Sequence, residues 1–131
     1  MSGSKVAIDT NAAIAWLNGD PDTGVLLRKH SEVFIPVVVL GELFYGGMNS
    51  ARVQENIVKL RGFVDMCTFL EITKVTAEIY GRLRFELKRK AKPIPDNDLW
   101  IAALCVEHRL PLVTSDAHFE MVEGLQLLWK R

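Results

Sequence analysis

A short apolar run that turns polar at Asp9 limits the folds open to this chain. Residues 6–8 are apolar, Asp9, Thr10 and Asn11 are polar, and apolar residues return over 12–17. This order predicts a buried strand, a tight turn and a helix. Because ligands bind at the carboxyl ends of strands in open α/β sheets, Asp9 is a candidate site residue. Capping of the following helix is the alternative role for Asp9 or Asn11.

The rest of the chain alternates between predicted helices and strands. We expect helices at 21–30, 50–66, 73–91 and 96–104, a helical turn at 117–121, and strands at 32–36, 69–72, 110–114 and 126–128. Residues 37–47 are expected to begin as a strand and to end as a helix. Asn49 and Ser50 are predicted caps of one helix and Asp96 of another. Such alternation predicts an α/β fold with a parallel sheet covered by helices on both faces.

Composition places the chain among globular proteins. Its 131 residues are most simply one domain, in which residues 1–4 resemble a cloning remnant and are assigned no role. Sixteen Lys and Arg residues balance 16 Asp and Glu residues, so net charge neither favours nor excludes a nucleic-acid partner. Cys67 and Cys105 lack the spacing of a zinc site and indicate a reducing compartment. With no secretory signal and no apolar run long enough to cross a bilayer, we expect a cytoplasmic protein without a membrane partner.

Four acidic residues stand out by their surroundings. Asp9 and Asp116 follow predicted strands. Glu42 interrupts an apolar helical stretch, and Asp98 opens an apolar helix after a proline break. Charged side chains are rarely buried without partners, so each acid needs a cap, a salt bridge or a metal ion. Capping suits Asp116 but not Glu42, which lies inside its predicted helix.

Convergence of these acids would define their chemistry. Four carboxylates within about 5 Å would cost roughly 3 kcal/mol for each pair at an effective dielectric of about 20, so the cluster would have to hold protons or bind a cation. Oxygen ligands without Cys or His favour Mg²⁺ or Mn²⁺, which suit phosphodiester hydrolysis. Nearby polar side chains are expected to orient the carboxylates or bound waters: Thr10, Asn11, Thr114 and Ser115. The histidines are expected to be surface or turn residues without a catalytic role: His30, His108 and His118.

These residues lie within four motifs, Ile8–Asn11, Gly41–Leu43, Asp98–Ala103 and Leu112–Phe119. In this order and at these separations the motifs resemble the PIN-domain ribonucleases. The chain is most similar to the VapC-type toxins of bacterial and archaeal toxin–antitoxin pairs. Each motif alone is weak, but the four together span essentially the whole chain.

The resemblance implies a three-layer α/β/α PIN-like domain with a mostly parallel sheet of four to five strands. It also implies a Mg²⁺- or Mn²⁺-dependent endoribonuclease, a homodimer and a small cognate antitoxin. The family's catalytic, metal-binding acids match four positions of this chain: Asp9, Glu42, Asp98 and Asp116. Since the family's acid directly precedes the Ile-Ala-Ala helix, Asp98 is preferred as the ligand. Asp96 is left as a cap or as a residue supporting the site.

Basic residues gather just before the proline break, at Arg82, Arg84, Lys88, Arg89, Lys90 and Lys92. Because this run leads into Asp98, we expect its end to lie near the metal site and to dock RNA phosphates. A solvated helix face is the alternative. Trp16, Tyr45 and Met48 are candidates for an exposed apolar patch that serves a dimer or an antitoxin helix.

Three other functions stay open at this point. A non-catalytic PIN-like binding module is the main one, although a retired site has no physical reason to keep four repelling acids. A phosphoacceptor signalling module needs an Asp at the end of a central strand, where the chain has Glu71, and a late Lys, where it has Thr114–Asp116. A haloacid-dehalogenase-type phosphatase needs a second Asp two residues after the first, where the chain has Asn11.

Overall fold

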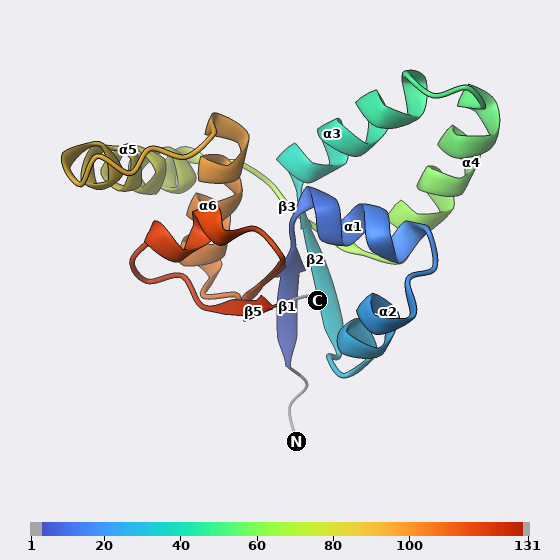
Figure 1. The fold of residues 1–131 in the computed structure, drawn as a ribbon, viewed down its shortest axis with the longest axis horizontal. Coiled ribbons are helices and arrows are strands. Elements are labelled where there is room, and N and C mark those ends of the chain that lie inside the picture. The colour runs from blue at the N-terminus through green and yellow to red at the C-terminus, as the bar shows by residue number, and fades with distance from the viewer. Residues whose placement is uncertain (1–3, 130–131) are drawn as a thin grey trace.

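Five parallel strands form the centre of the computed structural model, which describes residues 4–129 (Figure 1). The strands are β1 (Lys5–Ile8), β2 (Glu32–Pro36), β3 (Thr68–Leu70), β4 (Leu112–Thr114) and β5 (Leu127–Trp129). Their order in the sheet is β3-β2-β1-β4-β5, and each of these neighbouring pairs is parallel. The predicted α/β class and strand number are thereby confirmed.

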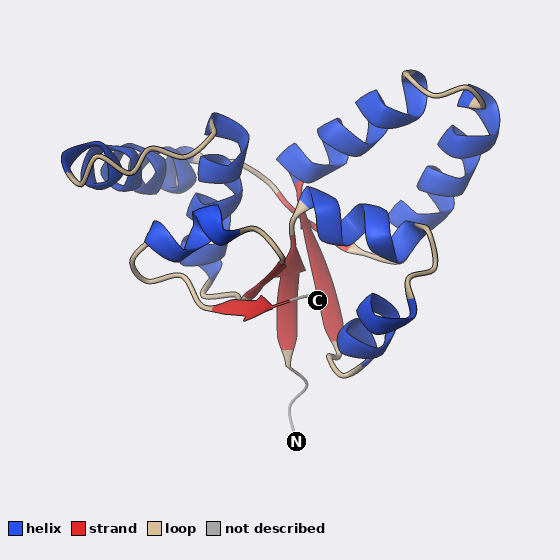
Figure 2. Cartoon of the chain, viewed as in Figure 1, coloured by secondary structure: helices blue, strands red, loops and turns tan. Residues whose placement is uncertain are grey.

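Helices cover both faces of the sheet, which gives the expected three layers (Figure 2). One face carries α1 (Thr10–Leu17), α2 (Pro21–Arg28), α3 (Val37–Met48) and α4 (Val53–Val64). The other carries α5 (Lys74–Arg89), α6 (Asp96–His108) and the 3₁₀ turn η1 (Ala117–Met121). Among residues 4–129, no helix combines the length and apolar character that a membrane span requires.

The two central strands place the site at one edge of the sheet. The apolar residues of β1 and β4 are fully buried, at Val6, Ala7, Ile8, Leu112 and Val113. Continuous apolar runs are typical of strands that are covered on both faces. Ala7 pairs with Leu112 and Ile8 with Val113, so β1 and β4 end side by side. The polar residues that follow each strand therefore meet at the same place.

The prediction of a strand at the start of residues 37–47 is wrong. Strand β2 ends at Pro36, and α3 begins directly at Val37. Val39 and Leu43, four residues apart, are both buried, so the helix places its apolar side against the core. The β-branched residues of this segment favour a strand locally, but packing on the completed sheet outweighs that preference.

The predicted capping of α4 is also wrong. Helix α4 begins at Val53, after Arg52, rather than at Ser50. The Ser50 hydroxyl donates to the Gly47 carbonyl at 2.6 Å and so serves the end of α3. The same oxygen accepts from the side-chain amide of Asn56 in α4 at 2.8 Å, so Ser50 links the two helices instead of capping the backbone of α4. Cys67 and Cys105 are free thiols.

Candidate metal centre

Asp9 occupies the end of β1 with its carboxylate held on both sides. Its side chain is 3% exposed, and Oδ1 accepts from the Ala12 backbone N–H at 2.9 Å. Oδ2 accepts from the Thr114 hydroxyl at 2.5 Å. The first bond caps α1, so Asp9 has the capping role that was its alternative as well as a place in the site. Its two bonds fix the carboxylate in one orientation.

Thr114 links two of the four acids. It is the last residue of β4, is fully buried, and donates its hydroxyl proton to Asp9. The same oxygen accepts from the Asp116 backbone N–H at 2.9 Å. The hydroxyl is therefore satisfied as donor and acceptor, and it ties the loop after β4 to the end of β1. Its predicted orienting role is consistent with these contacts.

Glu42 reaches the same edge of the sheet from α3. Its Oε1 accepts from the Thr10 hydroxyl at 2.7 Å, and Thr10 is the first residue of α1. Thr10 thus orients Glu42, as Thr114 orients Asp9. Each of the two acids is held by a threonine from a different element, which leaves little freedom for either carboxylate.

Asp98 shows that the four acids converge. It lies in the first turn of α6, where the helix dipole favours a negative charge. Its pKa is nevertheless raised from 3.8 to about 6, first by burial and then by the charges of Asp116, Glu42 and Asp9. A carboxyl whose pKa rises through three neighbouring carboxylates lies in an excess of negative charge. The structure therefore brings together the four acids that the sequence singled out.

His118 is the site residue that the sequence analysis missed. It lies in η1 with its side chain 56% exposed, as expected for a turn residue, but its ring faces the acids. Nδ1 lies 3.1 Å from Asp116 Oδ1 and 3.9 Å from Asp98 Oδ2. One ligand atom from each of these three residues lies within 4.8 Å of the others. The available signal was the spacing, since a side chain two residues after a strand-end acid can return to that acid.

The remaining predicted residues differ in their positions. Asp96 does not cap α6, because Pro95 occupies the cap position. Its carboxylate instead accepts from the Tyr80 hydroxyl at 2.6 Å, toward α5, so Asp98 is the acid of this pair that faces the cluster. The side chains of Asn11 and Ser115 are exposed. An orienting role for these two residues stays a prediction.

The donor set suits a hard or borderline divalent cation. Carboxylates that lie close together are a cost to the folded protein unless a proton or cation neutralises them. Mg²⁺ sites use oxygen ligands, and Mn²⁺ sites use oxygen ligands and also accept an imidazole. An ion there would join residues from β1, α3, α6 and the loop after β4.

Comparison with known proteins identifies the fold. The sequence profile of the PIN domain matches residues 6–125. The chain belongs to the PIN domain family. It is 33% identical over 125 residues to ribonuclease VapC2 of Rickettsia felis, across 92% of this chain and 93% of that protein. It is 31% identical over 126 residues to the tRNA(fMet)-specific endonuclease VapC of Shigella flexneri, across 93% of this chain and 95% of that protein.

A comparison with solved structures also supports the fold. The crystal structure of VapBC2 from Rickettsia felis bound to a DNA fragment from their promoter matches with a TM-score of 0.87 at 29% identity. The match covers 95% of this chain and 98% of that one. The predicted resemblance to VapC-type PIN proteins is confirmed, and the phosphoacceptor and haloacid-dehalogenase alternatives are excluded because they belong to other families.

The basic cluster of the PIN domain divides into two groups. Arg84 donates to the Tyr80 hydroxyl at 3.0 Å and lies 3.9 Å from Asp96, at the start of α6. Lys90 instead donates to the Met121 carbonyl at 3.2 Å, at the end of η1. Figure 1 shows why, because the segment after α5 runs back along that helix before α6 begins. The end of the cluster was expected near Asp98, but the basic residue that reaches the first turn of α6 is Arg84, from the middle of α5, and it contacts Asp96.

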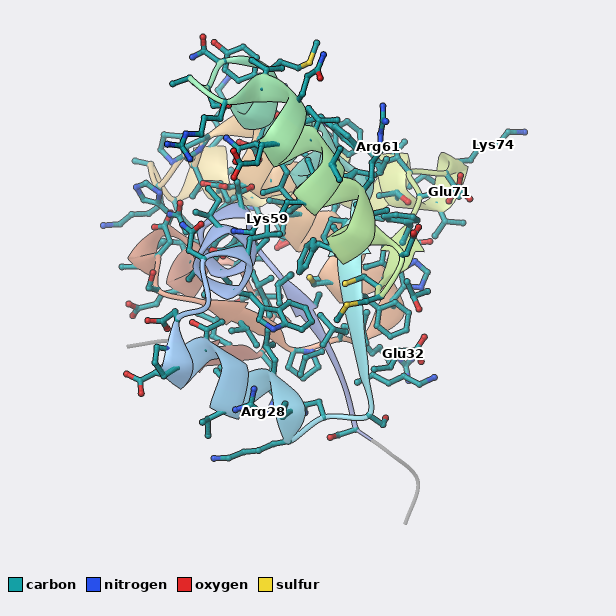
Figure 3. The ribbon with its side chains drawn as sticks, turned by 90° about the vertical axis from the view of Figure 1, so that its right-hand side faces the viewer. Arg28, Glu32, Lys59, Arg61, Glu71 and Lys74 are labelled. Atoms are coloured by element: carbon teal, nitrogen blue, oxygen red, sulfur yellow. The ribbon has the colours of Figure 1, made fainter. Side chains whose placement is uncertain are left out.

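A groove beside Glu42 runs between α1, α3 and α4. Its volume is about 290 Å³, and it is lined by Ile14, Leu17, Asn18, Glu42, Leu43, Gly46, Gly47, Asn56, Lys59 and Leu60. Figure 3 views the α1–α4 side of the molecule and shows Lys59 beside α1, with Arg61 further along α4. Tyr45 and Met48 of α3 are 70% and 65% exposed, so these two residues of the predicted patch lie at the surface. Trp16 is half-buried and packs edge-on against Phe63, with ring centroids 5.0 Å apart.

Proposed function

We propose that this PIN domain is a Mg²⁺- or Mn²⁺-dependent endoribonuclease and the toxin of a toxin–antitoxin pair. The observation that carries the proposal is the gathering of acids at one edge of the sheet, where Thr114 ties Asp9 to the Asp116 loop and ligand atoms of Asp98, Asp116 and His118 lie within 4.8 Å of one another. The similarity to proteins named ribonuclease VapC2 and tRNA(fMet)-specific endonuclease VapC supports RNA as the substrate. The chemistry is hydrolysis of a phosphodiester bond, in which water attacks phosphorus and a ribose oxygen leaves.

Each acid has a separate part in this proposal. Asp9, Glu42, Asp98 and Asp116 are the catalytic and metal-binding residues. Bound there, a divalent ion supplies charge for a phosphate oxygen and lowers the pKa of a bound water. Thr114 holds the Asp9 carboxylate in place, and Thr10 holds that of Glu42. Two of the four ligands are thus oriented in advance, which reduces the reorganisation needed when substrate binds.

The test compares RNA cleavage by the wild type and by Asp9→Asn, each with Mg²⁺, with Mn²⁺ and with EDTA. Asp9→Asn keeps an oxygen that can accept from Ala12 but removes the negative charge, so we expect at least about a hundred-fold loss of cleavage. Asp22→Asn is a matched control, because Asp22 lies in the first turn of α2 on a different helix. Equal cleavage by Asp9→Asn and the wild type would mean that the mechanism is wrong. No cleavage by the wild type with either ion would instead favour a non-catalytic binding module.

The basic residues of α5 are proposed to bind the RNA backbone. Lys88, Arg89, Lys90 and Lys92 are exposed, and Arg84 lies beside the first turn of α6. Lys and Arg contacts to phosphate carry little sequence information, so they would position RNA rather than select it. Arg82 lies 3.5 Å from Glu86 and is partly neutralised by it.

The groove between α1, α3 and α4 is proposed to take part of a small cognate antitoxin. The VapBC2 structure supports a protein partner for chains of this kind. The groove ends at Glu42, so a basic side chain of a partner seated there would reach the acids. No heavy atom lies within 4 Å of a Cβ built on Gly46, so Gly46→Arg should fill the groove without disturbing the fold. Antitoxin that still inhibits the Gly46→Arg variant fully would place the partner elsewhere.

A cytoplasmic location and a homodimer complete the proposal. The two free thiols, Cys67 and Cys105, support a reducing compartment. The exposed side chains of Tyr45 and Met48 support a protein–protein contact on α3. Light scattering of the purified chain tests the dimer, and a monomer at all concentrations would contradict it.

A further inference from the structure

His118 is the member of the cluster that the proposed acidic quartet leaves without a function. Its ring extends from η1, and Nδ1 lies 3.1 Å from Asp116 Oδ1. The same atom lies 3.9 Å from Asp98 Oδ2. His118 therefore faces two carboxylates from two different elements, the loop after β4 and the first turn of α6.

A simple turn contact does not account for the position of this ring. The His118 backbone N–H already donates to Asp116 Oδ1 at 2.9 Å, which closes the turn without the side chain. The ring is 56% exposed, so packing does not confine it. A role confined to the turn does not explain why the ring faces Asp98.

The spacing fits ligands of one ion. Adjacent ligands of an octahedral ion with bonds of about 2.1 Å lie about 3.0 Å apart, and opposite ligands about 4.2 Å apart. The two distances from Nδ1, 3.1 Å and 3.9 Å, fall within that range. One ligand atom from each of Asp98, Asp116 and His118 lies within 4.8 Å of the other two, a separation at which one ion can contact all three.

We propose that Nδ1 of His118 is a direct nitrogen ligand of the divalent ion that Asp98 and Asp116 hold, so that the site takes Mn²⁺ in preference to Mg²⁺. The inference rests on the proposed function and specifies its ion. Mg²⁺ strongly prefers oxygen ligands, whereas first-row transition ions accept imidazole together with carboxylates and water. Oxygen ligands alone leave Mg²⁺ and Mn²⁺ open, and one imidazole decides between them.

The experiment measures nitrogen coordination directly. Tag-free protein is loaded with Mn²⁺, and electron spin-echo modulation of the bound ion reports whether a nitrogen-14 nucleus is coordinated. We expect a nitrogen signal in the wild type and its loss in His118→Ala. Isothermal titration with Mn²⁺ alone and with Mg²⁺ alone gives the two affinities. In His118→Ala the Mn²⁺ affinity should fall about ten-fold or more while the Mg²⁺ affinity changes little.

Two further variants make the test specific. His108→Ala is the matched control, because His108 is also exposed and lies 3.7 Å from a carboxylate, that of Glu107, at the opposite end of α6. It should retain the nitrogen signal and both affinities. His118→Asp replaces nitrogen by oxygen at the same place and should move the preference toward Mg²⁺.

The outcomes separate this inference from the proposed function. Mn²⁺ that binds without a nitrogen signal, or with a signal that survives in His118→Ala, overturns the inference while RNA cleavage leaves the nuclease proposal intact. Equal loss of Mn²⁺ and Mg²⁺ affinity in His118→Ala also overturns it, since the effect would then be general. If the wild type neither binds the ions nor cleaves RNA, the proposed function itself fails.

Discussion

At the scale of single residues, Thr114 connects two of the proposed metal-binding acids. Its buried hydroxyl donates to Asp9 and accepts from the Asp116 backbone. Thr114→Val keeps the shape but leaves the Asp9 carboxylate short of a donor and the Asp116 N–H without its acceptor. We expect a loss of about 1–3 kcal/mol in the free energy of unfolding and a weaker divalent-ion affinity. Chemical denaturation and isothermal titration measure the two effects.

The control for this variant is another fully buried threonine. Thr23 donates to Asp20 at 2.6 Å at the start of α2, a helix that contributes none of the four acids. Thr23→Val should reduce stability by a similar amount and leave the ion affinity unchanged. If both variants bind the ion equally well, Thr114 holds the fold together but does not organise the site.

Single residues also show how far the sequence could be interpreted. Asp9, Glu42, Asp98 and Asp116 were recognisable because an acid among apolar neighbours or at a strand end demands a partner. The contacts of the His118 and Asp96 side chains were not predicted, for a common reason. The sequence shows neighbours along the chain, but these two side chains are placed by contacts with other elements. His118 faces Asp98 on α6, and Asp96 bonds to Tyr80 on α5.

At the scale of secondary-structure elements, the position of α5 determines where RNA is expected. Arg84 lies beside the start of α6, whereas Lys90 contacts the end of η1. Arg84→Gln should therefore raise the KM for RNA about five-fold or more and leave kcat nearly unchanged. Lys88→Gln should have a smaller effect. In a plot of the logarithm of RNA affinity against the logarithm of salt concentration, the slope should become shallower by about 0.7 for each phosphate of single-stranded RNA that a variant no longer binds.

A larger effect of Lys88→Gln would mean that RNA follows the far end of α5. Arg84 also bonds to Tyr80, so circular dichroism and ion affinity must match the wild type before the KM is interpreted. Lys29→Gln is a control for charge alone, because Lys29 is exposed at the end of α2. It should change neither the KM nor the salt dependence.

Elements were predictable where periodicity and breakers agreed. The helix at α5 follows from its apolar spacing and the prolines after it, and the strand at β1 follows from a continuous apolar run that ends at Asp9. The segment that forms α3 was misassigned in its first half because Val37–Val39 favours a strand locally. The preceding strand had already filled its place in the sheet. Packing between elements determines whether this segment forms a strand or a helix, and the local sequence pattern gives no information about that packing.

At the scale of the whole molecule, the acidic cluster couples stability to pH. The pKa of Asp98 is about 6 in the folded protein, whereas the usual value for the carboxyl is 3.8. Between these values the folded state holds a proton that the unfolded state has released. Stability without metal must therefore fall as pH rises through this window and stay low above it. After allowance for the partial exposure of Asp98, we expect a loss of about 1 kcal/mol.

A bound divalent ion should reverse that trend, because its ligands must be deprotonated. We expect Mn²⁺ at about a hundred times its dissociation constant to add about 2.7 kcal/mol, or roughly 10 °C in Tm, near pH 7.5, and much less near pH 5. Thermal unfolding with EDTA and with Mn²⁺ at both values measures the two curves, which should diverge as pH rises. The Asp98→Asn variant tests whether Asp98 is the cause. Without metal, its stability should depend less on pH than that of the wild type, and Mn²⁺ should stabilise it much less. If the stability of the wild type changes with pH in the same way with EDTA and with Mn²⁺, ionisation of Asp98 does not destabilise the folded protein. The acids would then not form one site.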